Sequence, residues 1–194
     1  MMDRLSELSY NFFCKMNKEK IMLSNLRGMD TFMLDYFTDK PLVGVEVGVY
    51  RGHHSFLLLK HLNIEKLYLV DPYEVYSDES NLGTEDNISK AFEFASSRLC
   101  DYKDTIEFVK LYSKEAVGVV PDGLDFVYID ANHSYDFVRE DIAYWYSKVK
   151  PGGVIGGDNF EARYPGVARA VLEFVEDNNL DLKGYGVDWW VLKP

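Results

Sequence analysis

The chain has 194 residues, 47% of them hydrophobic, so it is long enough for one sizeable core and too short for two comfortable domains. Its 32 acidic and 21 basic side chains give a formal net charge of −11, which makes nucleic acids and anionic membranes poor candidates as partners. Cys14 and Cys100 are too few and too far apart for a disulfide framework, and no apolar run approaches the roughly 20 residues of a membrane helix, so we expect a soluble cytoplasmic protein.

Residues 1–40 carry aromatic and aliphatic side chains at mixed helical spacing, with a break near Arg27 and Gly28. This pattern predicts two or three short helices that cover the rest of the chain. From Leu42 onward, short β-branched runs alternate with helical stretches. We therefore divide one structural domain into an N-terminal helical cover, 1–40, and a ligand-binding region, 41–194.

The strand candidates are short runs of mostly β-branched and aliphatic residues: Val43–Val49, Lys66–Asp71, Ile106–Leu111, Asp125–Asp130 and Val154–Asp158. Helical spacing predicts Glu85–Leu99 with Thr84 as N-cap, Phe137–Val149, and a helix after Pro165. The last residues, LKGYGVDWWVLKP, predict an antiparallel hairpin about Gly186, in which we expect only one of Trp189 and Trp190 to be deeply buried. The whole pattern predicts an α/β fold with a doubly wound, mostly parallel seven-stranded sheet, whose ligands bind beyond the carboxyl ends of the strands.

The first strand-to-helix junction, EVGVYRG from Glu46 to Gly52, has glycines four residues apart at Gly48 and Gly52. That spacing differs from the glycine motifs that hold phosphates on backbone amides. An acid at this junction suits a cationic, phosphate-free ligand such as S-adenosylmethionine, and Asp71 after the second strand is placed to accept ribose hydroxyls. A tight turn or a strand end explains either feature alone, whereas the two together favour a cofactor site.

Two further strand ends carry oxygen ligands: Asp130, and the pair Asp158 and Asn159. If these strands are neighbours, the three side chains predict a site for Mg²⁺, with Ca²⁺ or Mn²⁺ as substitutes, that could activate an acceptor hydroxyl. His133 is a candidate general base because imidazole titrates near neutral pH. The alternatives are ordinary strand-end caps for the acids and a helix-capping loop residue for His133.

Five motifs, E-V-G-V-Y-R-G, L-Y-L-V-D-P-Y, I-D-A-N-H-S-Y-D, K-P-G-G-V-I-G-G-D-N-F and P-G-V-A-R-A-V, resemble those of class I S-adenosylmethionine-dependent methyltransferases. The resemblance covers about residues 42–194. Within that class, the motifs resemble more specifically the bacterial group that includes the macrolide-sugar O-methyltransferases. It implies a Rossmann-like fold with the cofactor held by Glu46, Gly48, Gly52, Ser55, Asp71, Ser113 and Asp130. Within this set, Asp71 would contact the ribose, Ser113 the adenine, and Ser55 the cofactor carboxylate. For the adjacent His53 and His54, a solvated helix start is at least as good an interpretation.

The trio Asp130, Asp158 and Asn159 resembles the metal ligands of the catechol O-methyltransferases, which place a lysine base where this chain has His133. We therefore expect an S-adenosylmethionine-dependent O-methyltransferase that acts on a small sugar or phenol with help from Mg²⁺. The alternatives are an NAD-type oxidoreductase on the same sheet and a cofactor-binding protein without catalysis. The N-terminal helices either close over the cofactor or form a homodimer interface, and the sequence leaves both open.

Overall fold

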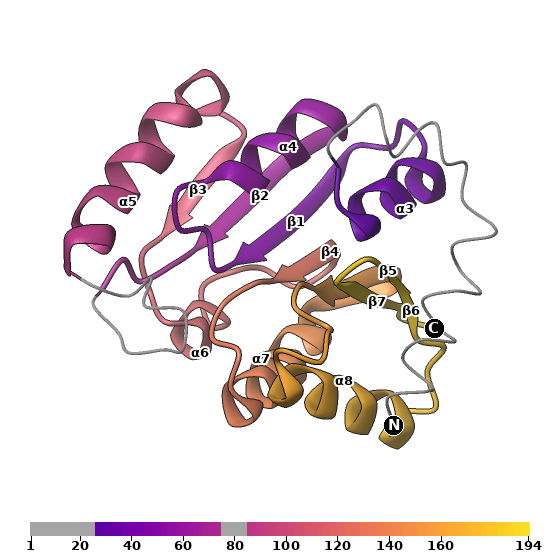
Figure 1. Ribbon diagram of the computed structural model, residues 1–194. Helices are drawn as coiled ribbons and strands as arrows, with labels where there is room; N and C mark the ends of the chain where they lie inside the picture. The colour runs from indigo at the N-terminus through magenta and orange to yellow at the C-terminus, as the bar shows by residue number, and fades with distance from the viewer. Residues whose placement is uncertain (1–25, 75–84) are drawn as a thin grey trace.

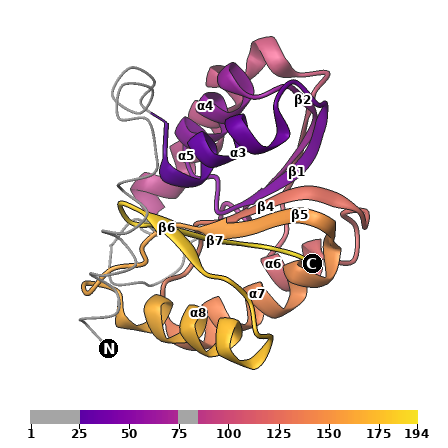
Figure 2. The same cartoon turned by 90° about the vertical axis from the view of Figure 1, so that its right-hand side faces the viewer.

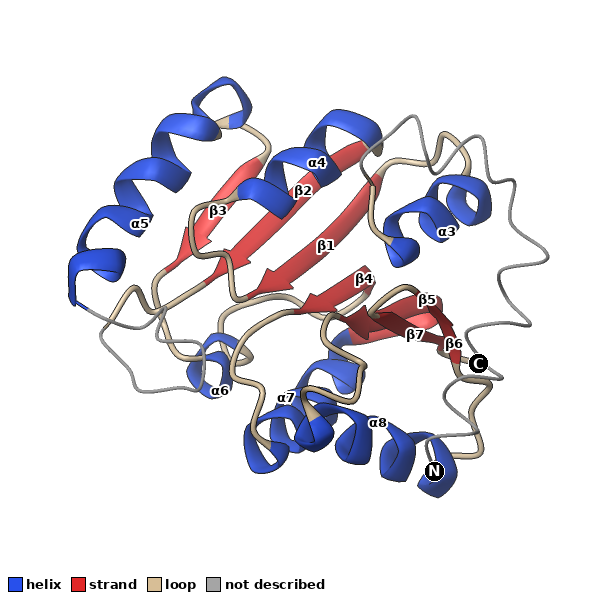
Figure 3. Cartoon of the chain, in the orientation of Figure 1, coloured by secondary structure: helices blue, strands red, loops and turns tan. Residues whose placement is uncertain are grey.

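The computed structural model describes residues 26–74 and 85–194, without the side chains of 85–87 and 89. Within these residues the chain forms one seven-stranded sheet: β1 Leu42–Val47, β2 Ile64–Val70, β3 Ile106–Val109, β4 Leu124–Ile129, β5 Val149–Gly157, β6 Lys183–Tyr185 and β7 Asp188–Leu192. The strand order is β3-β2-β1-β4-β5-β7-β6, and β1 to β5 pair in parallel while β7 is antiparallel to β5 and β6 (Figure 3). The predicted mostly parallel sheet with a terminal antiparallel hairpin is confirmed.

Helices cover both faces of this sheet (Figure 2). One face carries α3 Gly28–Phe37, α4 His53–His61 and α5 Glu85–Arg98, and the other carries α6 Ser113–Ala116, α7 Tyr135–Lys148 and α8 Pro165–Asp177; the short 3-10 helix η1 Cys100–Tyr102 precedes β3. Each face has its own apolar core. Trp189 belongs to one core and Trp190 to the other, at 1% and 0% exposure. The expectation that only one tryptophan is deeply buried was therefore wrong, because helices also cover the second face of the hairpin.

The largest boundary error concerns β5, which begins at Val149 rather than at Val154. Helical spacing had assigned Val149 to α7, yet it pairs with Leu124 of β4. Lys150 precedes Pro151, and a residue before proline is sterically disfavoured in the helical region, so the chain turns to extended backbone there. The other predicted elements differ from the structure by about one or two residues at their ends.

Helix α3 is the described part of the predicted N-terminal cover, and it packs on the terminal hairpin. A Cβ atom on Gly28 would lie 2.7 Å from the Tyr185 carbonyl oxygen, and the Phe32 and Trp190 ring centroids are 5.4 Å apart. Residues 1–25 and the predicted N-cap Thr84 lie outside the described residues. Of the helices described, none has both the length and the apolar character that a bilayer crossing requires.

Candidate active site

The carboxyl ends of four parallel strands meet at one edge of the sheet. β1 pairs in register with β2 and β4, and β4 pairs with β5, so Gly48, Asp71, Asp130 and Asp158 follow strand ends that lie side by side (Figure 1). The Asp130 backbone N–H donates to the Val47 carbonyl at 2.7 Å, which ties two of these ends together. The predicted convergence of the strand-end residues is present in the structure.

Gly48 and Gly52 are required by the backbone of the loop between β1 and α4. Gly48 has φ +91°, and a Cβ atom there would lie 2.0 Å from the Asp130 carbonyl oxygen. Gly52 has φ +67° and is the N-cap of α4. Both positions therefore favour glycine strongly. The close approach packs this loop on the end of β4, and a contact with the cofactor stays a prediction.

Asp71 organises the same loop. Its Oδ2 accepts hydrogen bonds from the backbone N–H groups of Val49 at 3.0 Å and Tyr50 at 2.8 Å, and its Oδ1 accepts from Tyr73 at 2.8 Å. Burial raises the pKa of Asp71, and these three bonds oppose that effect. A carboxylate offers about four acceptor positions, so one remains for the predicted ribose hydroxyl.

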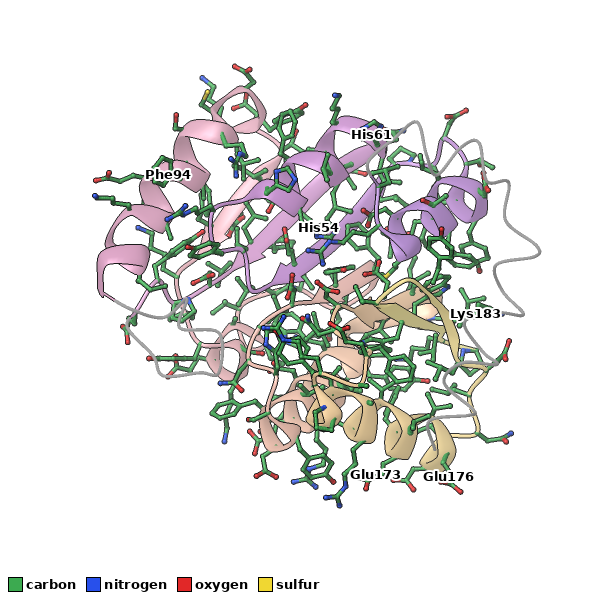
Figure 4. The ribbon with its side chains drawn as sticks, in the orientation of Figure 1. His54, His61, Phe94, Glu173, Glu176 and Lys183 are labelled. Atoms are coloured by element: carbon green, nitrogen blue, oxygen red, sulfur yellow. The ribbon has the colours of Figure 1, made fainter. Side chains whose placement is uncertain are left out.

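A buried acid–histidine–acid cluster lies beneath this loop, where Figure 4 shows His54 between α4 and α3. His54 Nδ1 is 3.1 Å from Glu46 Oε1, His54 Nε2 is 3.1 Å from Asp30 Oδ1, and the Ser55 hydroxyl donates to the other Glu46 oxygen. Burial alone would lower the pKa of His54, but Asp30 and Glu46 raise it to about 10. A solvated helix start thus describes the exposed His53 and is wrong for His54, which is 5% exposed. Glu46 and Ser55 are both buried and bonded to each other, so their predicted cofactor contacts stay untested.

Ser113 connects two helices on the opposite face. It accepts a hydrogen bond from Trp145 Nε1 at 2.8 Å and donates to Asp141. Burial raises the pKa of Asp141 to about 6, against the effect of the Ser113 hydrogen bond. Both partners lie on α7, so Ser113 has a structural role here, and its contact with adenine stays a prediction.

Asp130 and Asp158 are held together by an arginine that the sequence analysis did not assign to the site. Arg27 Nη1 donates to Asp158 Oδ2 at 2.7 Å, to Asp130 Oδ2 at 3.2 Å and to the Tyr128 hydroxyl at 2.6 Å. Burial would raise the pKa of Asp130, but His133 and Arg27 lower it. Burial and the nearby Asp130 raise the pKa of Asp158. The two carboxyl groups are therefore electrostatically distinct.

This arrangement does not fit the predicted divalent ion. Asp158 Oδ2 and Asp130 Oδ2 face Arg27, and Asp158 Oδ1 accepts the Asn159 backbone N–H at 2.7 Å. A metal at these oxygens would have to displace a cation that is already bonded to them. Across residues 26–74 and 85–194, no group of three His, Cys, Asp or Glu side chains is placed to hold a metal ion.

His133 lies beside the acid pair. Its Nε2 is 3.7 Å from Asp130 Oδ1, and its ring centroid is 4.6 Å from that of Tyr164. This nitrogen is buried and has no hydrogen-bond partner among the described residues. The residues around a small pocket here include His133, Asp130, Asp158, Val138, Val167 and Trp189. The pocket has room for about one water molecule, so a single hydroxyl group of an acceptor could reach the imidazole there.

Four polar residues of the site were missed by sequence reasoning: Arg27, Asp30, Tyr128 and Asp188. The Tyr128 hydroxyl donates to Asp188 Oδ1 at 2.9 Å, and the Met29 backbone N–H donates to Asp188 Oδ2 at 3.0 Å. Burial raises the pKa of Asp188 to about 7. The sequence does show that Tyr128 is a polar residue inside an apolar strand and that Arg27 stands at the start of a helix. Neither feature identifies the residue that it contacts.

The family described as a methyltransferase domain matches residues 45–160, which is more than half of the chain. The chain belongs to this family, and the expected class, an S-adenosylmethionine-dependent methyltransferase, is confirmed for this domain. It is also 30% identical over 148 residues to protein R132 of Acanthamoeba polyphaga mimivirus, which bears the name "Uncharacterized protein". That match covers 73% of this chain and 62% of R132, so the chain spans less than two thirds of its relative.

Two solved O-methyltransferases share the fold along nearly the whole chain. The Bacillus cereus enzyme, solved in complex with S-adenosylhomocysteine, is 16% identical with a TM-score of 0.62, covering 97% of this chain and 90% of that one. The O-methyltransferase NovP is 17% identical with a TM-score of 0.58, covering 98% and 79%. Other similar structures include ribosomal RNA methylases, so the fold leaves the methyl acceptor open.

Proposed function

We propose that this domain transfers the methyl group of S-adenosylmethionine to a hydroxyl oxygen of a small molecule, such as a sugar or a phenol. The observation that carries the proposal is His133, whose buried Nε2 lacks a hydrogen-bond partner among the described residues and lines a pocket beside Asp130. A general base must lie within reach of the proton that it removes, and this nitrogen would meet that condition for an acceptor whose hydroxyl group enters the pocket.

The residues present fit the cofactor. When bound, S-adenosylmethionine supplies an electrophilic methyl group on a cationic sulfur. Asp71 keeps one acceptor position for a ribose hydroxyl, and Gly48 lets the first loop approach the end of β4 without a side chain in between. Asp130 adds a carboxylate whose Oδ1 lies 3.7 Å from His133 Nε2.

Charge supports a small acceptor over a nucleic acid. The formal net charge of −11 disfavours a polyanionic substrate, and the pocket is lined on one side by Val138, Val167 and Trp189. A cytoplasmic location and a homodimer stay predictions. The described residues offer no site for the predicted magnesium ion, and no step proposed for this chain runs through it because Arg27 is bonded to the oxygens that it would need.

Isothermal titration calorimetry with S-adenosylhomocysteine, followed by a labelled-methyl screen over hydroxylated small molecules, tests the proposal. We expect His133→Gln to lower kcat by roughly a hundredfold or more, the usual scale of general-base catalysis, while the Kd for S-adenosylhomocysteine stays unchanged. His61→Gln is the matched control because His61, labelled in Figure 4, is the last residue of α4 and does not line the pocket. A wild-type protein without any heat of binding would refute the function.

A further inference from the structure

A guanidinium group occupies the position predicted for the metal ion. Arg27 Nη1 is 2.7 Å from Asp158 Oδ2 and 3.2 Å from Asp130 Oδ2, and it also donates to the Tyr128 hydroxyl. The Arg27 side chain is 31% exposed, and none of these bonds uses Nε or Nη2. Neither of these two nitrogens has a hydrogen bond to a described residue.

The backbone around Arg27 fixes this position. The Arg27 N–H donates to Asp30 Oδ2 at 3.1 Å, and its carbonyl accepts hydrogen bonds from the Thr31 N–H at 3.1 Å and the Thr31 hydroxyl at 3.0 Å. The Met29 N–H donates to Asp188 on β7. The start of α3 is thus bonded to the sheet, and it delivers Arg27 to the strand ends of β4 and β5.

A fixed arginine and a divalent ion exclude each other here. Arginine keeps its charge at any accessible pH, and Tyr128, Asp130 and Asp158 raise the pKa of Arg27 further, against the effect of burial. Two like charges that share the same carboxylate oxygens repel strongly at such short distances. Arginine also differs from a metal ion because it binds carboxyl groups through N–H donors with fixed directions.

We propose that Arg27 is the resident cation of this site, takes the place of the divalent metal and holds the acceptor oxygen through its remaining N–H groups. This inference rests on the proposed O-methyl transfer. The acceptor O–H proton passes to His133 Nε2, and the new O–CH₃ bond forms as the S–CH₃ bond breaks. The electron pair of that bond stays on sulfur as a thioether, and the positive charge of the sulfonium ends on the imidazolium. Arg27 keeps all its protons and stabilises the developing negative charge on the acceptor oxygen.

A Mn²⁺ titration followed by electron paramagnetic resonance of the free ion tests this without any activity measurement. We expect no stoichiometric binding by the wild-type chain. Arg27→Ala should bind one Mn²⁺ at least roughly tenfold more tightly, because a like charge next to the carboxylates is gone. The double variant Arg27→Ala, Asp158→Asn should lose that site again. Arg139→Ala, which removes an exposed arginine on α7, is the matched control and should behave as wild type.

The proposal is overturned if the wild-type chain binds one Mn²⁺ as tightly as Arg27→Ala, or if Arg27→Ala gains no affinity. Arg27→Lys keeps the charge and should bind no Mn²⁺. If Arg27→Ala does not fold, the wild-type chain and Arg27→Lys decide the matter. The proposal is overturned if the wild-type chain binds one Mn²⁺ and Asp158→Asn abolishes that binding. It is supported if neither the wild-type chain nor Arg27→Lys binds Mn²⁺. Wild-type calorimetry with S-adenosylhomocysteine separates the two hypotheses: without cofactor binding the proposed function fails, whatever the Mn²⁺ titrations show.

Discussion

His54 should make the stability of this protein fall with pH above neutrality. The imidazole is 5% exposed and lies 3.1 Å from both Asp30 and Glu46, and these acids raise its pKa from 6.5 to about 10 despite the opposing effect of burial. Because the folded pKa exceeds the unfolded one, the stabilisation is complete below pH 6.5 and is lost as pH rises through about 10.

The shift sets the expected size of the effect. One proton held only by the folded state corresponds to about 1.4 kcal/mol per pH unit, so the free energy of unfolding should fall by about 2 kcal/mol between about pH 7.5 and about pH 9. The full shift gives an upper limit of about 5 kcal/mol. Burial raises the pKa of Asp188 to about 7 and of Asp141 to about 6, so their contributions are lost mostly below this window.

Urea unfolding at several pH values, followed by circular dichroism, measures the slope directly. His54→Gln keeps one amide NH₂ donor for Asp30 and Glu46 but cannot titrate, so its stability should be nearly flat between about pH 7.5 and about pH 9. His61→Gln, at the other end of α4, should keep the wild-type slope. Equal slopes for wild type and His54→Gln would refute the buried imidazolium.

Four other substitutions test the site and the core. Asp71→Asn should weaken binding of S-adenosylhomocysteine by roughly ten- to a hundredfold in calorimetry, because a charged acceptor for the ribose is lost; an unchanged Kd would place the ribose elsewhere. Gly48→Ala should lower the free energy of unfolding, measured with urea, by more than about 1 kcal/mol, since its Cβ would lie 2.0 Å from the Asp130 carbonyl oxygen at φ +91°. Wild-type stability would contradict that contact. Trp189→Ala and Trp190→Ala should each cost about 3–5 kcal/mol in the same assay, and a small loss for either would mean that only one face of the hairpin is covered.

The sheet could be predicted because its signals are local. β-branched runs, glycine junctions and amphipathic spacing each lie within a few residues, and parallel topology follows from their alternation. The start of β5 was missed because Val149 continues the apolar spacing of α7, and the pairing with Leu124 that makes it a strand residue is a long-range contact. The burial of Trp190 likewise depends on α3, which packs from the other end of the chain.

The same difference between local signals and long-range contacts decides which residues of the candidate site could be predicted. Residues that follow strand ends, such as Asp71, Asp130 and Asp158, could be grouped because parallel strands end at one edge. Arg27 could not be assigned, because 103 and 131 residues separate it from Asp130 and Asp158 and no local pattern connects them. A strand-end acid looks the same in the sequence whether it binds a metal ion or an arginine.

Two internal cations balance part of the acid charge at this edge of the sheet. The connected acids of the site are Asp30, Glu46, Asp130, Asp158 and Asp188, and the cations bonded to them are Arg27 and His54. These internal cations fix the directions of the carboxyl groups, so little reorganisation is needed when charge moves during methyl transfer. Acids remain in excess, which favours a cationic sulfur at the same edge. Since Arg27 and Asp30 both come from the start of α3, this helix contributes charges to the site as well as apolar contacts to the sheet.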